Sequence, residues 1–322
     1  MSFDIQYHRY VLKSDQGLNA LSERTQMEGC LIRVGVGVGC IHPWVELGDE
    51  PLQQQLQALR RDQPLRLGRR ALQCASVDGA AREKGVSLFA GLSIPESHLT
   101  VNPGMDLAKQ QMGLFSRIKI KGTTDLRATR EKAQRCLQRA APDSLLRLDF
   151  NGCLDTSVAM NLAEMLGDDI CKRIEFVEDP VKYEQEVWQR LRRQTGLALA
   201  VDRECEQAIE ISGGADCLVF KPAVVDALAL AESLAKSGGG EKWVVTSYMD
   251  HAMGQMFAAY QAAVLKARFP ERLAQCGLLT HGLFERDEFF ESVQHEGPKL
   301  LVPEGTGLGF DEQLKNLQWE SL

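Results

Sequence analysis

The sequence lacks the features that mark a membrane-bound or exported chain. Its apolar runs fall well short of the roughly eighteen residues that a transmembrane helix needs. Residues 1–17 carry polar or charged side chains every few positions, so the apolar core of a signal peptide is missing. We therefore expect a soluble, cytoplasmic protein that does not bind membranes.

Basic residues are also too few for a protein that binds nucleic acid. The 37 Lys and Arg against 44 Asp and Glu leave a formal net charge of −7, so the overall field repels phosphate backbones. Nine cysteines are present, but none forms a Cys-x-x-Cys pair, and we expect reduced thiols rather than disulfides. With 44% hydrophobic and 25% charged residues, the 322-residue chain has a globular composition and can bury a large core.

The first hundred residues predict an α+β unit. Two segments rich in β-branched residues and glycine favour strands of an antiparallel sheet, and two later segments carry apolar residues at helical spacing. The glycine-rich stretch 35–39 lacks the spacing of a dinucleotide-binding loop, so we interpret its glycines as close-packing positions within strands. Strands are predicted at 5–12 and within 30–40, and helices at 51–61 and 69–84.

From about residue 114, short apolar strands alternate with amphipathic helices. Such alternation is typical of parallel strands joined by crossover helices. The strand ends at positions 121, 149, 178, 202, 221 and 247 are 28, 29, 24, 19 and 26 residues apart. This spacing is near the roughly 30 residues per unit of a (β/α)₈ barrel and favours a barrel over an open sheet. Strands are predicted at 115–121, 145–151, 174–178, 197–202, 217–221, 242–247 and 277–281, and helices at 125–140, 157–166, 184–195, 205–212, 226–237 and 251–267.

Charged side chains occur at the carboxyl ends of these strands. Segment 115–121 alternates with period two, which places its two last lysines on the face that points into the barrel. The next three strands end in acids, and the strand after them ends in a further lysine. Because the loops that follow barrel strands meet at one mouth, we expect three carboxylates bracketed by lysines there. The residues at these positions are Lys119, Lys121, Asp149, Glu178, Asp202 and Lys221.

Three converging carboxylates predict a divalent cation. They repel one another, and their hard oxygens suit Mg²⁺, with Mn²⁺ as a second possibility. A lysine beside such a cation is partly desolvated and close to positive charge, which lowers the pKa of its amine and allows it to act as a base. His42, His251 and His281 have no His partner four residues away, so we expect structural or supporting roles for them.

The motifs at the strand ends carry a family resemblance. They read Lys119-x-Lys121, Asp149-x-Asn151, Glu178-Asp-Pro, Asp202 and Lys221-Pro, and in combination they resemble the muconate-lactonizing branch of the enolase superfamily. Segment 244–254 resembles that family's seventh-strand region. Segments 281–283 and 305–309 resemble the C-terminal part of its o-succinylbenzoate synthases. The resemblance covers residues 27 to 312.

This resemblance implies an α/β fold, a (β/α)7β modified TIM barrel with an N-terminal α+β capping domain completed by the C-terminal segment. The expected units are 1–100 for the cap, 101–290 for the barrel with its metal site, and 291–322 for the segment that returns to the cap. Loops 14–25 and 40–50 would cover the active site.

The resemblance also implies roles for single residues. Arg203 follows the third expected metal ligand directly, where the family usually has an acid. The implied ligands of Mg²⁺ are Asp149, Glu178 and Asp202; the implied catalytic residues are Lys121 as the base, Lys221 across the substrate and Lys119 near its carboxylate; and the implied substrate-binding residues are Asn151 and Ser247.

The activity implied is that of a hydro-lyase acting on a small carboxylate. It would form o-succinylbenzoate from 2-succinyl-6-hydroxy-2,4-cyclohexadiene-1-carboxylate in menaquinone biosynthesis, through a lysine that removes the α-proton and an enediolate stabilised by Mg²⁺. An N-acylamino acid racemase, a dipeptide epimerase or a muconate-type cycloisomerase on the same scaffold are the alternatives. The Asp-x-Asp of related dipeptide epimerases is missing from 280–287. A Schiff-base aldolase or a binding protein without turnover would leave the three acids unexplained.

Overall fold

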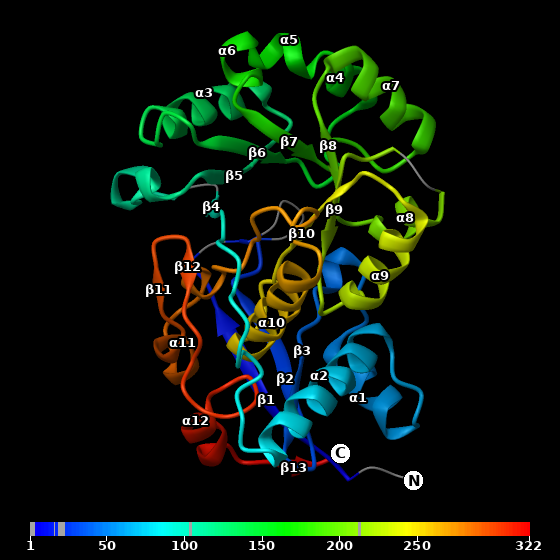
Figure 1. Cartoon of the computed structure of the whole chain (residues 1–322), viewed down its shortest axis with the longest axis vertical. Helices are drawn as coiled ribbons and strands as arrows, with labels where there is room; N and C mark the ends of the chain where they lie inside the picture. The colour runs from blue at the N-terminus through cyan, green and yellow to red at the C-terminus, as the bar shows by residue number, and fades with distance from the viewer. Residues whose placement is uncertain (1–3, 16, 19–22, 103–104, 212–213) are drawn as a thin grey trace.

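The computed structural model describes residues 4–15, 17–18, 23–102, 105–211 and 214–322, which form a curled parallel sheet and a separate antiparallel sheet (Figure 1). The parallel sheet has the order β10-β9-β8-β7-β6-β5-β4, and the antiparallel one has the order β13-β1-β2-β3. The predicted α/β barrel with an α+β cap is thus confirmed. The strands of the two sheets are β1 (Ile5–Lys13), β2 (Gln26–Val34), β3 (Gly37–Ile41), β4 (Leu99–Val101), β5 (Arg117–Lys121), β6 (Leu145–Asp149), β7 (Ile174–Glu178), β8 (Leu199–Val201), β9 (Cys217–Phe220), β10 (Lys242–Val245) and β13 (Glu320–Ser321).

In the cap, helix α2 packs directly on strand β3. A Cβ atom on Gly37 would lie 1.9 Å from the Ala75 carbonyl oxygen, and one on Gly39 would lie 2.0 Å from that of Ala71. Only glycine permits so close an approach, which confirms the close-packing interpretation for Gly37 and Gly39. For Gly35 it is wrong, because this residue lies in the turn with a φ of 60° and nothing within 4 Å of its hypothetical Cβ. Segment 30–40 is divided between β2 and β3 by a turn. The helices of the cap are η1 (Val45–Leu47), α1 (Leu52–Arg60) and α2 (Arg66–Glu83).

The barrel helices α3 to α7 lie outside strands β5 to β8 (Figure 1). The predicted helices match the observed ones within a few residues, with one exception. Segment 157–166 is not one helix, because Asn161 leaves helical geometry at φ −102° and ψ 9°. The helices are η2 (Leu107–Lys109), η3 (Met112–Leu114), α3 (Leu126–Leu137), α4 (Thr156–Met160), α5 (Leu162–Leu166), α6 (Asp168–Cys171), α7 (Gln185–Thr195), α8 (Cys205–Ile211), α9 (Ala227–Ser237) and α10 (Ala252–Arg268).

The barrel closes through single bridges instead of the strand predicted at 277–281. Gly277 pairs with Thr246 just beyond β10, and Cys276 pairs with Ser97 just before β4, both in parallel. The His98 amide donates to the Cys276 carbonyl at 2.7 Å, which ties the two edges together. Of the residues predicted in this strand, only Gly277 pairs with a neighbouring strand, and the last one, His281, begins helix η4 (His281–Leu283).

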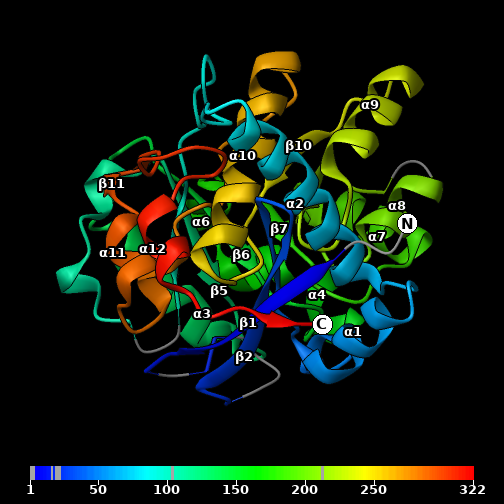
Figure 2. The same ribbon diagram turned by 90° about the horizontal axis from the view of Figure 1, so that it is seen from below.

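The C-terminal segment returns to the cap. Strand β13 pairs with β1, and in Figure 2 the red C-terminal ribbon meets the blue strand β1. Buried Asp78 of α2 accepts from the Val38 amide at 2.9 Å and from the Leu308 amide at 2.7 Å, so one carboxylate joins β3 to this segment. Its elements are α11 (Glu288–Ser292), β11 (His295–Glu296), β12 (Lys299–Leu300) and α12 (Asp311–Asn316).

The cap covers the barrel where strands β9 and β10 end. Tyr248, just beyond β10, is buried in the same apolar cluster as Trp44 and Leu56 of the cap. The Trp44 indole donates to the Tyr248 carbonyl at 2.8 Å. None of the helices in the described part of the chain is both long and apolar enough to cross a membrane.

Candidate active site

Five neighbouring strands, β5 to β9, bring the predicted site residues into one row. Lys121 of β5 pairs directly with Asp149 of β6, which pairs directly with Glu178 of β7. Asp202 follows β8 and Lys221 follows β9. The period-two pattern of 115–121 places Lys119 on the same inward face. The structure therefore brings the six predicted strand-end residues to one mouth of the barrel.

Each acid in this row is in contact with at least one lysine. Lys119 Nζ donates to Glu178 Oε1 at 2.6 Å and lies 2.8 Å from Asp149 Oδ2. Lys121 Nζ donates to the same Asp149 oxygen at 2.5 Å. Lys221 Nζ donates to Asp202 Oδ2. Lys119 is nearly buried, whereas Lys221 keeps 20% of its side chain exposed.

The acids respond differently to this arrangement. Burial alone would raise the pKa of Asp149, but its contacts with Lys119 and Lys121 lower the pKa well below the usual range. Burial and the neighbouring charge of Asp149 raise the pKa of Glu178 to about 7, although Lys119 opposes this. The lysines therefore compensate the negative charge of the row only in part.

The pKa values of Lys119 and Lys221 shift in the opposite direction to the one expected. Burial lowers the pKa of Lys119, but the charges of Asp149 and Glu178 outweigh it and the net pKa is raised. The pKa of Lys221 is also raised, because Asp202 outweighs the effect of burial. The predicted lowering assumed a divalent cation beside each amine. With protein charges alone, the carboxylates decide the direction.

The carboxylates offer the donor set that a divalent cation requires. Among the described residues, no group of three His, Cys, Asp or Glu side chains is arranged to coordinate a metal ion. Each of the three predicted ligands is instead paired with a lysine. Asp149, Glu178 and Asp202 are nevertheless all buried at this mouth. Burial and the charge of Asp149 both raise the pKa of Glu178, so positive charge bound there would favour its ionised form. Hard oxygens in a negatively charged, buried site fit Mg²⁺ or Mn²⁺.

The two predicted substrate-binding residues lie at the same rim. Asn151 has a left-handed φ of 49°, and its amide donates to Asp149 Oδ1 at 3.1 Å. Its Nδ2 is buried without a hydrogen-bond partner among the described residues, so this donor is available to a ligand. Ser247 is buried and its hydroxyl is 2.7 Å from that of Thr280.

Two family models match the chain on either side of the cap–barrel boundary. Residues 5–81 match the family described as "O-succinylbenzoate synthase, N-terminal domain", and residues 105–314 match "Enolase C-terminal domain-like". The o-succinylbenzoate synthase of Bdellovibrio bacteriovorus is 31% identical over 99% of this chain and 98% of that protein. The chain belongs to the o-succinylbenzoate synthase family of the enolase superfamily. The o-succinylbenzoate synthase of Edwardsiella ictaluri is 27% identical over 83% of this chain and 88% of that protein.

Solved structures of the enolase superfamily share the fold. The dipeptide epimerase from Cytophaga hutchinsonii, in complex with Mg and the dipeptide D-Ala-L-Val, has a TM-score of 0.77 at 18% identity and covers 99% of this chain and 98% of that one. The L-Ala-D/L-Glu epimerase from Bacillus subtilis has a TM-score of 0.76 at 17% identity, over 96% of this chain and 98% of that one. At such identities the likeness concerns the fold alone.

Asp179 also belongs to this site, although no role for it was predicted from the sequence. Its carboxylate accepts from the backbone amides of Asp202 and Arg203, both at 3.1 Å, and thereby fixes the position of Asp202. Burial and nearby Asp202 raise its pKa well above the usual range. The motif Glu178-Asp-Pro contains this residue, and it is the sequence feature from which a role for Asp179 could have been predicted. The family usually has an acid directly after the third ligand, and in this chain the acid Glu204 comes one position later. Its carboxylate accepts from the Tyr183 amide at 3.2 Å.

A second charged layer lies one pleat below the site. Arg147 is fully buried and donates to Glu175 Oε2 at 2.6 Å, and its Nη1 lies 2.8 Å from His98 Nδ1. Glu175 also contacts Arg117 at 3.0 Å. Because Arg147 precedes Asp149 by two positions on β6, it supports the floor of the mouth.

The three histidines have the structural contacts expected of them. His251 Nδ1 accepts from the Met253 amide and caps helix α10. His42 Nδ1 is 3.1 Å from the Tyr10 hydroxyl, and His281 Nδ1 is 3.0 Å from Gln255 Nε2. Burial lowers the pKa of His42 and of His251 to about 3, so both rings are neutral near pH 7.

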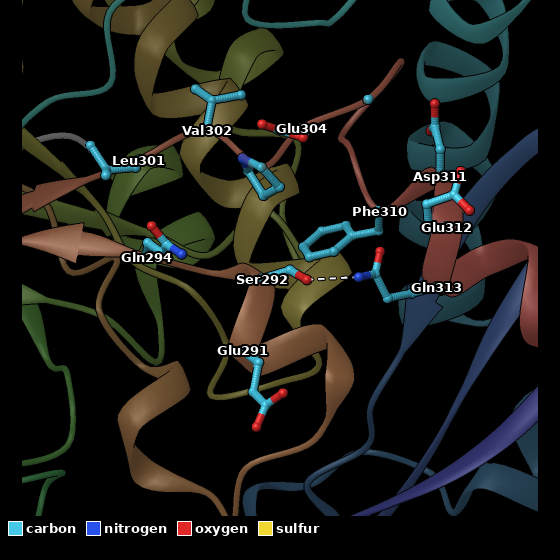
Figure 3. Close-up of a pocket in the computed structure, with 12 residues that line it drawn as sticks. Glu291, Ser292, Gln294, Leu301, Val302, Glu304, Phe310, Asp311, Glu312 and Gln313 are labelled. Carbon is cyan, nitrogen blue, oxygen red and sulfur yellow. Dashed lines mark hydrogen bonds between the residues drawn. The ribbon is translucent and has the colours of Figure 1, made fainter.

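A cavity of about 580 Å³ lies apart from the barrel mouth, between α11, the loop after β12 and α12 (Figure 3). Its walls combine apolar Leu301 and Val302 with the carboxylates of Glu291 and Glu304. Asp311, also on this wall, is paired with Arg82 at 2.5 Å. The six strand-end residues of the barrel mouth do not line this cavity. The chemistry is therefore assigned to the mouth and not to this cavity.

Proposed function

We propose that the chain is a metal-dependent hydro-lyase that converts 2-succinyl-6-hydroxy-2,4-cyclohexadiene-1-carboxylate to o-succinylbenzoate in menaquinone biosynthesis. One observation carries the proton transfer in this proposal: two lysines flank a row of buried acids from opposite sides. The similarity to o-succinylbenzoate synthases supports the choice of substrate. In the sheet order, β5 with Lys121 and β9 with Lys221 are separated by the three strands that carry or precede the acids. A flat ring bound over the acids would have one lysine on each side.

Asp149, Glu178 and Asp202 would hold Mg²⁺ or Mn²⁺. The bound cation supplies positive charge that stabilises the carboxylate oxygens of the substrate as the α-proton leaves. Lys119, which lies between Asp149 and Glu178, adds a second positive charge beside the same oxygens.

Lys121 is the base of the proposed reaction. Its neutral amine takes the proton α to the carboxylate, and the C–H electron pair moves into the ring and carboxylate. The C–O bond to the ring hydroxyl then breaks, and the Lys121 ammonium returns its proton to the departing hydroxide. Water and an aromatic ring are formed, and the amine is restored. Lys221 remains protonated and faces the developing negative charge.

Epimerisation of a dipeptide or N-acylamino acid is the second candidate. The opposed lysines favour it, because two bases on opposite faces could exchange an α-proton. Segment 280–287, which contains η4, lacks the Asp-x-Asp that related epimerases place there. Dehydration is therefore the better supported reaction.

The deciding experiment uses purified protein and Mg²⁺ in D₂O. One sample receives the cyclohexadiene substrate and another a panel of N-acylamino acids and dipeptides. We expect rapid appearance of the aromatic product, absent with Lys121→Ala, and slow or no α-deuteration of the panel. Deuteration of a panel member without dehydration of the first substrate would refute the proposal in favour of epimerisation.

A further inference from the structure

An aromatic ring from the neighbouring strand end faces Lys221. Tyr248 follows β10, and Lys221 Nζ lies 5.7 Å from the centre of its ring. This is within the roughly 6 Å at which an ammonium is attracted to an aromatic face. Tyr248 is 6% exposed, so water competes little for this contact. Lys221 thus has two neighbours of opposite kind, the carboxylate of Asp202 and the ring of Tyr248.

The ring itself is held by the cap. The Tyr248 hydroxyl donates to Asp49 Oδ2 at 2.8 Å. The same oxygen accepts from the Trp44 amide at 3.0 Å, and the Trp44 indole donates to the Tyr248 carbonyl at 2.8 Å. Trp44 and Asp49 are both buried. These bonds form a closed ring of contacts between the cap loop and the barrel, which we call the Tyr248 clasp.

A second cap contact acts on the backbone beside Lys221. Arg70 of α2 is buried, and its Nε donates to the carbonyl of Pro222 at 2.8 Å. Its Nη1 lies 3.0 Å from Asp226 in the same loop. The cap therefore restrains the backbone after Lys221 directly, through Arg70. It also acts on the Lys221 side chain indirectly, because it holds the ring of Tyr248.

We propose that Tyr248 is a positioning residue that holds the Lys221 ammonium toward the substrate, with Asp49 and Trp44 keeping its ring in place. A lysine side chain has many rotamers, and fixing one of them places its charge where negative charge develops. When the oxygens of Asp202 engage a cation, the ring is the contact that continues to restrain Lys221. This inference rests on the proposed function, in which Lys221 faces the reacting ring.

The test compares three variants of the full chain. Tyr248→Leu removes the ring, and Tyr248→Phe keeps the ring but removes the bond to Asp49. Tyr260→Leu is the matched control, since Tyr260 packs against Phe89 and is half-buried on α10. For each variant, acetylation of Lys221 by acetic anhydride is measured by mass spectrometry relative to Lys119 in the same protein. The kcat and KM for dehydration are measured in parallel.

We expect Tyr248→Leu to raise the ratio of Lys221 to Lys119 labelling at least threefold and to lower kcat at least tenfold with KM within twofold. Tyr248→Phe should change the labelling ratio and kcat in the same directions but by smaller factors. Tyr260→Leu should change neither the labelling ratio nor kcat. If Tyr248→Leu does not fold, the Tyr248→Phe labelling ratio decides. An unchanged ratio in the folded Tyr248 variants would overturn the inference. If the proposed function is wrong, the wild-type protein will not dehydrate the cyclohexadiene substrate. The labelling ratios of the variants still test the Tyr248 clasp in that case.

Discussion

Lys121 and Lys221 differ in what surrounds them, although each is paired with an acid. Lys121 touches Asp149, which Lys119 also neutralises, whereas Lys221 has Asp202 and the Tyr248 ring. We predict that Lys121→Ala lowers kcat for dehydration by about 10³-fold or more, since general-base catalysis contributes about 10²–10⁴-fold. Lys221→Arg, which keeps a cation, should lose only about 10-fold to 100-fold.

Steady-state kinetics on both variants check this asymmetry. Circular dichroism of each variant controls for folding. Near-normal turnover by Lys121→Ala together with an inactive Lys221→Arg would mean that the base is on the β9 side of the barrel.

Asp250 is a buried acid outside the row. Burial raises its pKa from 3.8 to about 7, backbone hydrogen bonds at Tyr248 and Asp250 offset only part of this, and its Oδ1 has no partner among the described residues. Because the native pKa lies above the unfolded one, its favourable contribution is present below about pH 4 and is lost as pH rises to about 7. We predict that Asp250→Asn raises the free energy of unfolding at pH 8 by about 2–4 kcal/mol.

Urea unfolding at pH 4.5 and pH 8 measures the effect. The gain from Asp250→Asn should shrink at the lower pH. Asp155→Asn, at an exposed position, is the control and should show no such difference. A gain that is equal at both pH values would contradict the assignment.

Single residues were predictable from sequence where strand periodicity alone decides their direction. Lys119, Lys121 and Asp149 follow this rule. Asp179 and Tyr248 do not, because their roles come from contacts with residues of other elements. The 202–203 backbone defines the role of Asp179, and the cap loop defines that of Tyr248. Contacts between residues far apart in the chain cannot be predicted from the local pattern of apolar and polar residues.

At the scale of elements, the contact between β3 and α2 is the least tolerant. A methyl group on Gly39 would overlap the Ala71 carbonyl, and neither backbone can move without disturbing its own hydrogen bonds. We predict that Gly39→Ala destabilises the protein by about 3 kcal/mol, at the upper end of overpacking effects. Thermal and urea unfolding measure this change.

Gly240→Ala is the matched control for Gly39→Ala. Gly240 has nothing within 4 Å of its hypothetical Cβ and is not among the glycines with positive φ. Its substitution should change the free energy of unfolding by less than about 0.5 kcal/mol. Equal effects of the two substitutions would show that the helix can withdraw from the strand.

Elements were predictable where alternation is regular and long. Strands β5 to β10 and their helices follow from it within a few residues. Strand β4, with three residues, is too short for a period to appear, and the closure at 273–277 depends on single bridges to Ser97, Trp243 and Thr246. The break at Asn161 depends on packing that hydrophobic spacing does not encode.

At the scale of the whole molecule, a bound cation should stabilise the fold. A ligand that binds only the native state adds about 2.7 kcal/mol at a concentration of 100 times its Kd. We predict that millimolar Mg²⁺ or Mn²⁺ raises the Tm, that EDTA reverses the rise, and that activity follows the same course. Differential scanning calorimetry measures the shift, with Ca²⁺-free and Mg²⁺-free buffer as reference.

Glu178→Gln provides the control for the cation effect. It keeps the shape of the side chain but removes one charged oxygen donor, so the shift in Tm should largely disappear. A full shift in this variant, or full activity of the native protein in excess EDTA after dialysis, would contradict the metal assignment.

The pairing of β1 with β13 has a consequence for biosynthesis. Tyr7 donates to Glu320 at 2.7 Å across 313 positions of the chain, and Ser97 meets Cys276 only after every barrel unit between them has been made. Contacts of such sequence separation form late, because loop closure must precede them. During translation, a β1–β2–β3 sheet can assemble early, yet one edge stays unpaired until residues 320–321 leave the ribosome. The newly made cap thus carries an open strand edge for most of its synthesis, which is the interval in which a chaperone or a neighbouring nascent chain could capture it.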